Sequence, residues 1–326
     1  MTLYYDPISY VVTEKEDGWL LKTVLQRRLR VSRKLLSRIK LTERGVLLNG
    51  TRVYISVPVK TGDLVSISLE QETSEDILPQ PIPFDIVFED ESLLIVDKAP
   101  GIIVHPTHGH YTETLANGVV HYWKEQGKQY RFRPVHRLDQ ETSGLIAIAK
   151  NAYIHQHISE QLIAGTVTKK YKALVHGCPV VSEGIIDGPI DRDPEQPHRR
   201  IVTPAGYSAL TSYKVIDCYG YGKGALVELR LGTGRTHQIR VHMTSIGHPL
   251  IGDKMYTLEH VPKRDGETSS SHDDDPMKDW IARQALHASE LGFEHPLTGE
   301  ELLFTATLPA DMEKLRQRLE GSTALE

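Results

Sequence analysis

The sequence predicts an α+β fold, with a mixed, largely antiparallel sheet and flanking helices preceded by a small α/β domain. Strand-like and helix-like segments follow one another without strict alternation, which favours antiparallel pairing. The length of 326 residues suits two domains, and 39% hydrophobic residues are enough for packed cores. Charge divides the chain in the same way, because a strongly basic stretch near the N-terminus precedes an acidic one.

Residues 15–70 are predicted to form the small domain. Apolar residues recur at steps of three and four between Val24 and Ile39, which predicts helix, and Ser32 can cap a second helix. The Asn49-Gly50 pair between two apolar runs predicts a hairpin, and alternation after Gly62-Asp63 predicts a further strand. This order of elements resembles the small RNA-binding module first described in ribosomal protein S-four.

The charge of this domain predicts a polyanionic partner. Between positions 22 and 60 there are eleven Lys or Arg residues against one Glu, although the formal net charge of the chain is −5. A local excess of this size attracts a polyanion whatever the net charge. The resemblance implies that the partner is RNA, and the predicted contacts lie on the two helices: Arg27, Arg28, Arg33, Lys34 and Arg38. A basic helix face that is only solvated is the alternative.

Residues 71–83 are predicted to be a linker, stiffened by three prolines and kept in solvent by acidic residues. The large domain follows over residues 84–315, and its acidic segment 259–279 is predicted to be a surface loop. Its predicted strands lie at 93–96, 145–149, 167–175 and 226–231, and its predicted helices at 115–123, at 151–165 and around Ile239.

The most specific segment is His-Arg-Leu-Asp-Gln-Glu-Thr-Ser-Gly-Leu at 136–145. An aspartate in a loop just before an apolar strand is held near a buried layer, where a carboxylate needs a cationic partner. This segment resembles the hallmark of the RluA family of pseudouridine synthases. Other segments match that family in the same order, so that the resemblance covers about residues 84–310: 96–106, 170–177, 234–242 with 247–253, and 286–296.

The resemblance implies an RNA pseudouridine synthase, which detaches uracil from ribose, turns it and rejoins it through a carbon. No atom is gained or lost, so no cofactor is expected. Asp139 is implied to be the catalytic carboxylate, Arg235 the arginine that pairs with it, and Tyr171 the ring that stacks on the base or accepts the sugar proton. Taken alone, Tyr171 on a strand face with Val167 and Val175 would more often be a core residue, and Arg235 could belong to a phosphate-binding turn.

Three further residues are implied to bind the substrate. Arg137 matches the residue that displaces the target nucleotide from its stack, and a planar guanidinium can fill such a gap. His136 and Thr142 belong to the same segment. No metal is predicted, because the clustered His105, His108 and His110 lack the converging ligands that zinc needs.

Large-subunit ribosomal RNA is the predicted substrate, and transfer RNA is the alternative. A non-catalytic ribosome assembly factor on the same scaffold and a nucleoside-bond hydrolase are the rival functions; the hydrolase would need a second carboxylate or a metal to activate water. We expect a cytoplasmic monomer with no membrane partner, since the sequence shows no signal peptide and no apolar run long enough to span a bilayer. Cys178 and Cys218 are predicted to be buried small hydrophobes, with no disulfide framework.

Overall fold

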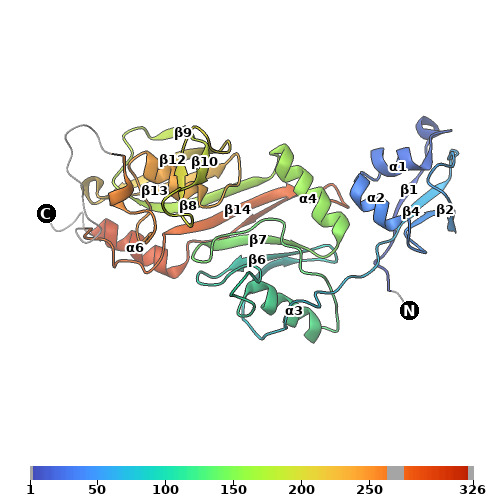
Figure 1. Ribbon diagram of the computed structural model, residues 1–326, viewed down its shortest axis with the longest axis horizontal. Helices are drawn as coiled ribbons and strands as arrows, with labels where there is room; N and C mark the ends of the chain where they lie inside the picture. Colours follow the sequence, from blue (N-terminus) through green and yellow to red (C-terminus); the bar gives the residue numbers. More distant parts are fainter. Residues whose placement is uncertain (1–2, 263–274, 322–326) are drawn as a thin grey trace.

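The computed structural model describes residues 3–262 and 275–321, which form a small N-terminal body and a large one (Figure 1). The helices are α1 (Leu21–Arg27), α2 (Arg33–Ile39), α3 (Leu115–Glu125), α4 (Ala152–Ala164), α5 (Gln238–Ser245) and α6 (Ala310–Gly321). The strands are β1 (Ile8–Val11), β2 (Val46–Leu48), β3 (Thr51–Arg52), β4 (Leu64–Ile67), β5 (Asp85–Glu89), β6 (Leu93–Lys98), β7 (Ser143–Ala149), β8 (Thr168–His176), β9 (Glu183–Asp187), β10 (Ile190–Arg192), β11 (Arg200–Val202), β12 (Leu210–Tyr219), β13 (Gly224–Leu231), β14 (Leu286–Glu294) and β15 (Glu301–Thr305).

The N-terminal module, residues 4–70, packs α1 and α2 against a sheet in the order β1-β4-β2-β3. The two predicted helices are present, and the Ser32 hydroxyl caps α2 by accepting a hydrogen bond from the Leu35 amide. Asn49 and Gly50 both have positive φ, as a tight hairpin turn requires. The module begins before the predicted boundary at residue 15, because β1 pairs with β4 along its whole length.

The large domain is built on one sheet, which confirms the predicted α+β class. Within the described residues this sheet has nine strands in the order β5-β6-β7-β14-β8-β13-β12-β9, with β15 added beside β14. Every pairing is antiparallel except that of β7 with β14. Helices cover both faces of its β6–β7 part: alternate residues Leu94 and Val96 join the core under α3, whereas Leu93 and Ile95 join the core under α4.

The N-terminal module rests on α4, beside which it lies in Figure 1. The Gln156 side chain of α4 accepts a hydrogen bond from the Ser32 amide and donates one to the Arg30 carbonyl. The Tyr153 hydroxyl donates to the Leu29 carbonyl, and apolar residues of the module and of the large domain share one core. The module is therefore joined to the large domain by packing as well as by the chain.

The segment 71–83 differs from the solvated linker that the sequence predicts. Ser74 and Ile77 are buried, and the Ser74 hydroxyl accepts a hydrogen bond from the Phe132 amide. The carboxylate of Glu72 pairs with Arg38 of the module and with Arg133 of the large domain. Prolines prevent this segment from joining a sheet, but its side chains still pack along the large domain.

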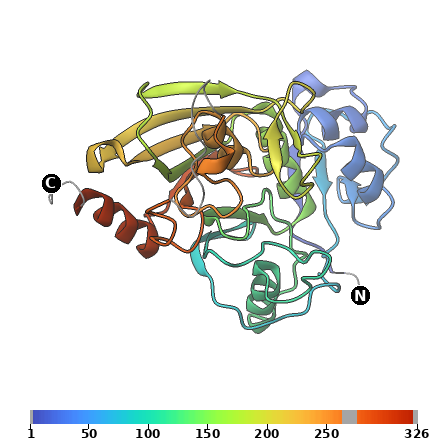
Figure 2. The ribbon, with the colours of Figure 1, turned by 60° about the vertical axis from the view of Figure 1, so that its left-hand side comes forward.

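The C-terminal boundary also lies beyond the prediction, because α6 continues past residue 315 and buries Leu315 and Leu319. Figure 2 shows α6 on the side of the molecule away from the N-terminal module. Of the predicted acidic surface loop 259–279, residues 263–274 lie outside the described residues. After that gap Asp275 and Met277 are buried, so this end of the segment is part of the core. Within the described residues, no helix is long and apolar enough to cross a membrane.

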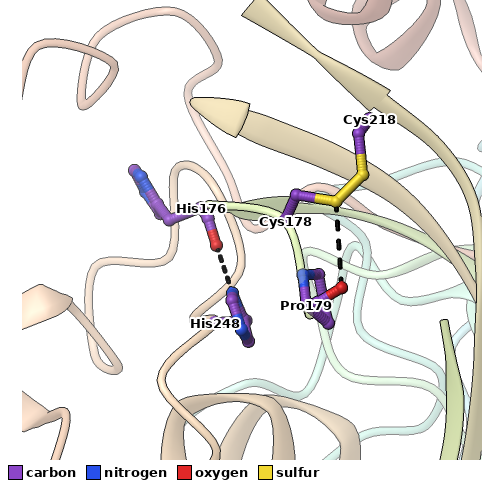
Figure 3. Close-up of a disulfide and its surroundings, with 5 residues drawn as sticks. All are labelled: His176, Cys178, Pro179, Cys218 and His248. Carbon is purple, nitrogen blue, oxygen red and sulfur yellow. Dashed lines mark hydrogen bonds between the residues drawn. A yellow bond between two sulfur atoms is a disulfide. The ribbon is translucent and has the colours of Figure 1, made fainter. Parts of the chain in front are cut away.

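Cys178 and Cys218 form a disulfide, so the prediction of two buried, unpaired cysteines was wrong (Figure 3). Cys178 follows β8, Cys218 lies near the end of β12, and their Cα atoms are 5.8 Å apart. Strand β13 separates β8 from β12, but β13 begins only at Gly224, so the chain after β8 can pass its end and reach β12. Cys218 is exposed at this edge of the sheet.

We predict that Gly144→Ala disrupts the only parallel pairing of the described sheet. Gly144 has φ +115°, and an added Cβ would lie 2.3 Å from the carbonyl oxygen of Ala288 and 2.5 Å from its nitrogen. Because both atoms belong to the backbone of β14, the strands must separate, and we expect a loss of about 3 kcal/mol in the free energy of unfolding, measured in urea.

Gly165→Ala is the matched control, since Gly165 also has positive φ but no atom lies within 4 Å of the added Cβ. Backbone strain alone should cost this variant about 1 kcal/mol. Equal losses for the two variants would contradict the steric explanation.

Candidate active site

A cavity of about 990 Å³ opens between the segment before β7, the end of α4, strands β8 and β13, and the start of α5. All six residues that the sequence predicts for catalysis or substrate binding line this cavity: His136, Arg137, Asp139, Thr142, Tyr171 and Arg235. They come from segments up to about 100 residues apart, so the fold brings the predicted site together in one place.

Asp139 lies in the loop that leads into β7, and its carboxylate faces the cavity. A turn closed by the Thr142 amide, which donates to the Asp139 carbonyl at 3.1 Å, holds the loop. Carboxylate oxygen Oδ2 lies 3.3 Å from Nη1 of Arg240. Oxygen Oδ1 has no hydrogen-bond partner among the described residues. One oxygen of the carboxylate is thus anchored and the other is available to a substrate.

The arginine beside Asp139 is Arg240, so the predicted pairing with Arg235 was wrong. Arg235 lies in the turn before α5, where its Nε donates to the Ser208 carbonyl and its guanidinium lies 5.6 Å from the ring centre of Tyr207. Arg240 lies within α5 and is almost fully buried. A signal was present in the sequence, because a charge between Ile239 and Val241 on an apolar helix needs a buried partner.

Arg240 also binds a second carboxylate, which the sequence prediction missed. Its Nε and Nη2 donate to the two oxygens of Asp253 at 2.6 and 2.8 Å. Burial by itself lowers the pKa of Arg240, but the hydrogen bonds to Asp253 and the charges of Asp253 and Asp139 outweigh burial and raise the pKa above its ordinary value. The guanidinium therefore remains charged between two carboxylates.

Tyr171 lies on β8, at the boundary between the apolar core and the cavity. It is buried and belongs to the apolar core, and it also lines the cavity. Burial, with a smaller effect of the Asp139 charge, raises the pKa of Tyr171 well above its ordinary value. Its phenol is therefore neutral at physiological pH.

The remaining predicted residues occupy different depths of the cavity. Burial lowers the pKa of His136 to about 4, so its imidazole is neutral, and its buried Nδ1 has no hydrogen-bond partner among the described residues. Arg137 is exposed at the rim. Thr142 is buried, and its hydroxyl accepts a weak hydrogen bond from Gln284 at 3.4 Å.

Comparison with known proteins identifies the family. The family model described as RNA pseudouridylate synthase matches residues 92–245. The uncharacterized RNA pseudouridine synthase YhcT of Bacillus subtilis is 37% identical over 308 residues, which cover 94% of this chain and 96% of that protein. The chain belongs to the RluA-type RNA pseudouridine synthases. It is therefore an isomerase that converts uridine in RNA to pseudouridine.

Two further relatives extend the comparison. The ribosomal large subunit pseudouridine synthase D of Zymomonas mobilis is 35% identical over 318 residues, covering 94% of this chain and 96% of that one. The solved structure of human RNA pseudouridylate synthase domain containing 4 superposes with a TM-score of 0.56 at 24% identity, over 72% of this chain and 92% of that chain. The structural match supports the same fold.

Lys98 holds the Asp139 loop in place. The sequence prediction missed this role. Lys98 is almost fully buried at the end of β6, and its Nζ donates to the carbonyls of Ala99, Ile102 and Gln140 at 2.8, 2.9 and 2.9 Å. Burial lowers the pKa of Lys98 to about 7, whereas the charges of Glu141 and Asp139 act to raise it. The three hydrogen bonds tie the turn after β6 to the residue that follows Asp139.

The predicted RNA-binding arginines and lysine are exposed on the N-terminal module, but not all are equally available. Arg28 pairs with the buried Glu16, and Arg38 pairs with Glu72. Arg27 lies over the ring of Trp19. Arg33 and Lys34, in the first turn of α2, have no carboxylate partner among the described residues.

No group of three or more His, Cys, Asp or Glu side chains that could hold a metal occurs in residues 3–262 and 275–321.

We predict that Lys98→Met destabilises the synthase and slows its reaction. Methionine fills a similar volume but leaves three carbonyls without their donor, which should cost about 3 kcal/mol of unfolding free energy in urea. Because Gln140 adjoins Asp139, the rate of pseudouridine formation should fall as well. Lys124→Met replaces an exposed lysine of α3 and should change neither quantity. A Lys98→Met protein of unchanged stability would show that the three hydrogen bonds do not hold the loop.

Proposed function

We propose that the enzyme isomerises uridine in large-subunit ribosomal RNA, with Asp139 as its catalytic carboxylate. The observation that carries the role of Asp139 is the asymmetry of its carboxylate in a side chain that lines the cavity: Arg240 engages Oδ2, and Oδ1 has no protein partner among the described residues. Direct attack on ribose C1′ and removal of the C2′ proton can both use Oδ1. In either route the C1′–N1 bond breaks, a C1′–C5 bond forms, C5 loses a proton and N1 gains one. The bond between Asp139 and C1′ is broken again in the first route, and the proton taken from C2′ is returned to C2′ in the second.

Tyr171 is proposed to stack on the target uracil. Its ring lines the cavity that contains Asp139, and its raised pKa keeps the phenol protonated in the free enzyme. A protonated phenol is a poor proton acceptor, so the side chain suits stacking better than general-base catalysis. The neutral imidazole of His136, with its unpartnered Nδ1, is proposed to contact the nucleotide in the same cavity.

The two exposed arginines at the cavity are proposed to contact the RNA around the target. Arg137 can take the place of the extruded base, because a planar guanidinium stacks on neighbouring bases. Arg235 keeps its Nη groups available while its Nε is bound to Ser208, so we assign it to an RNA phosphate instead of to Asp139. Thr142 is proposed to hold the Asp139 loop by its backbone amide.

One observation favours ribosomal RNA over transfer RNA, and a second supports the binding of RNA in general. A relative that spans nearly the whole chain is named ribosomal large subunit pseudouridine synthase D. The N-terminal module, residues 4–70, also presents basic residues on α1 and α2 for phosphates beyond the target nucleotide. We infer that the enzyme acts as a cytoplasmic monomer without a metal or cofactor.

The first test uses Asp139→Asn on unmodified ribosomal and transfer RNA, without added metal or cofactor, with pseudouridine mapped in each. We expect the wild type to modify large-subunit ribosomal RNA. The variant should bind the same RNA but lose turnover by on the order of 10³-fold or more, because the amide cannot act as nucleophile or base. Modification of transfer RNA alone would overturn the substrate assignment, and turnover by the variant would overturn the role of Asp139.

The second test removes two unpaired cations of α2 in the double variant Arg33→Ala/Lys34→Ala. If both contact phosphates, the affinity for RNA should fall, and the slope of log K against log salt should decrease by about 1 for each residue. The control is Lys124→Ala/Lys314→Ala, which removes two exposed lysines from α3 and α6. Identical slopes for the two double variants would reject a role for Arg33 and Lys34 in RNA binding.

A further inference from the structure

A second polar residue, His237, faces Asp139 beside Arg240. It is the N-cap of α5, and its Nε2 lies 3.9 Å from Oδ2 of Asp139. Its backbone is left-handed, with φ 57° and ψ 18°. A residue other than glycine rarely adopts this conformation, which costs of order 1 kcal/mol and persists where the surroundings enforce it.

A chain of hydrogen bonds lies behind the imidazole. The backbone amide of Arg200 donates to the hydroxyl oxygen of Tyr256 at 2.8 Å, and that oxygen lies 3.0 Å from Nδ1 of His237. Tyr256 is almost fully buried, and its ring packs edge-on against the imidazole. Both side chains are therefore held in one orientation.

These hydrogen bonds determine which nitrogen of His237 carries the proton. A backbone amide can only donate, so the Tyr256 hydroxyl accepts from Arg200 and directs its own hydrogen to the other neighbour, Nδ1. Nδ1 is then the acceptor, and the proton of the neutral imidazole lies on Nε2. Nε2 is the nitrogen that faces Asp139.

The charge state of His237 follows from the groups packed around it. Burial lowers its pKa, and the cations Arg240 of α5 and Arg200 of β11 act in the same direction. The carboxylates of Asp139 and Asp253 oppose them, and the Tyr256 phenol is neutral because burial raises its pKa to about 12. The net lowering leaves the imidazole neutral near pH 7, as a donor without charge.

We propose that His237 is a positioning residue for Asp139, with its Nε2–H directed at Oδ2 by Tyr256 and Arg200. The proposal rests on the proposed catalytic role of Asp139. Arg240 and His237 both lie next to Oδ2 of Asp139. Together they fix the orientation of the carboxylate about its Cβ–Cγ bond and leave Oδ1 for the ribose. The gap of 3.9 Å shortens to a hydrogen bond when the substrate fills the cavity, since such contacts often tighten only in the complex.

The first experiment measures the tautomer in the full-length enzyme without RNA, by ¹⁵N NMR of its histidines, with His237→Gln used to assign the signal. We expect Nε2 of His237 to be protonated and Nδ1 to be a hydrogen-bond acceptor. In Tyr256→Phe the donor to Nδ1 is removed, and the two tautomers should become mixed. A proton on Nδ1 in the wild type, or no change in Tyr256→Phe, would overturn the proposal.

The second experiment compares His237→Phe with His237→Gln by steady-state kinetics over a range of pH. Both replacements bear the same left-handed backbone, but only glutamine can place an N–H near the position of Nε2. Loss of one donor to a carboxylate should lower kcat by about tenfold in His237→Phe with KM changed less than about twofold. The acidic limb of the kcat/KM profile should move to higher pH. His237→Gln should recover most of both effects.

The outcomes separate this inference from the function on which it rests. Turnover by Asp139→Asn would remove the proposed role of Asp139, whereas full activity and an unmoved pH profile in His237→Phe would remove only that of His237. Equal losses in the two His237 variants with an unmoved acidic limb would indicate a purely structural residue and would also overturn the proposal. His121→Gln, on α3, is the control for replacing a histidine.

Discussion

The candidate active site depends on one buried guanidinium that is shared by two carboxylates. Arg240 binds Asp253 through two hydrogen bonds and reaches Asp139 through a third. A buried charge is stable only when it is paired, so Arg240 needs both partners. This requirement links α5, the loop before β7 and the segment after α5.

The sheet supplies the rigid frame on which this contact rests. The single parallel pairing in the described sheet, β7 with β14, lies directly after the Asp139 loop, and Gly144 permits the close approach of the two strands. Lys98 fastens the other side of the loop through the Gln140 carbonyl. The Asp139 carboxylate is thus held between the start of β7 and a buried lysine, and its proposed role needs such a fixed position.

Helix α4 connects the cavity with the N-terminal module, residues 4–70. Near its start Tyr153 and Gln156 bind the backbone of the module, and at its end Leu162 and Ile163 line the cavity. One helix therefore sets the position of the basic helices relative to the cavity that contains Asp139. An RNA that uses both must bridge the distance that α4 defines.

Local patterns in the sequence were sufficient for α1 to α5 and for seven of the fifteen described strands, because caps and turns depend on neighbouring residues: Ser32 and Asn151 cap helices, and Asn49-Gly50 forms the hairpin. Ordered motifs were likewise sufficient to indicate the family. They were also sufficient to predict that Asp139 and Tyr171 share one site, and both line the same cavity. Only the tertiary structure decided that Arg240, not Arg235, meets Asp139, since that depends on where α5 begins and which face it buries. The tertiary structure likewise decided three further contacts: the disulfide, the hydrogen bond from Lys98 to the Gln140 carbonyl, and the contact of His237 with Tyr256. Each joins segments that only folding brings together.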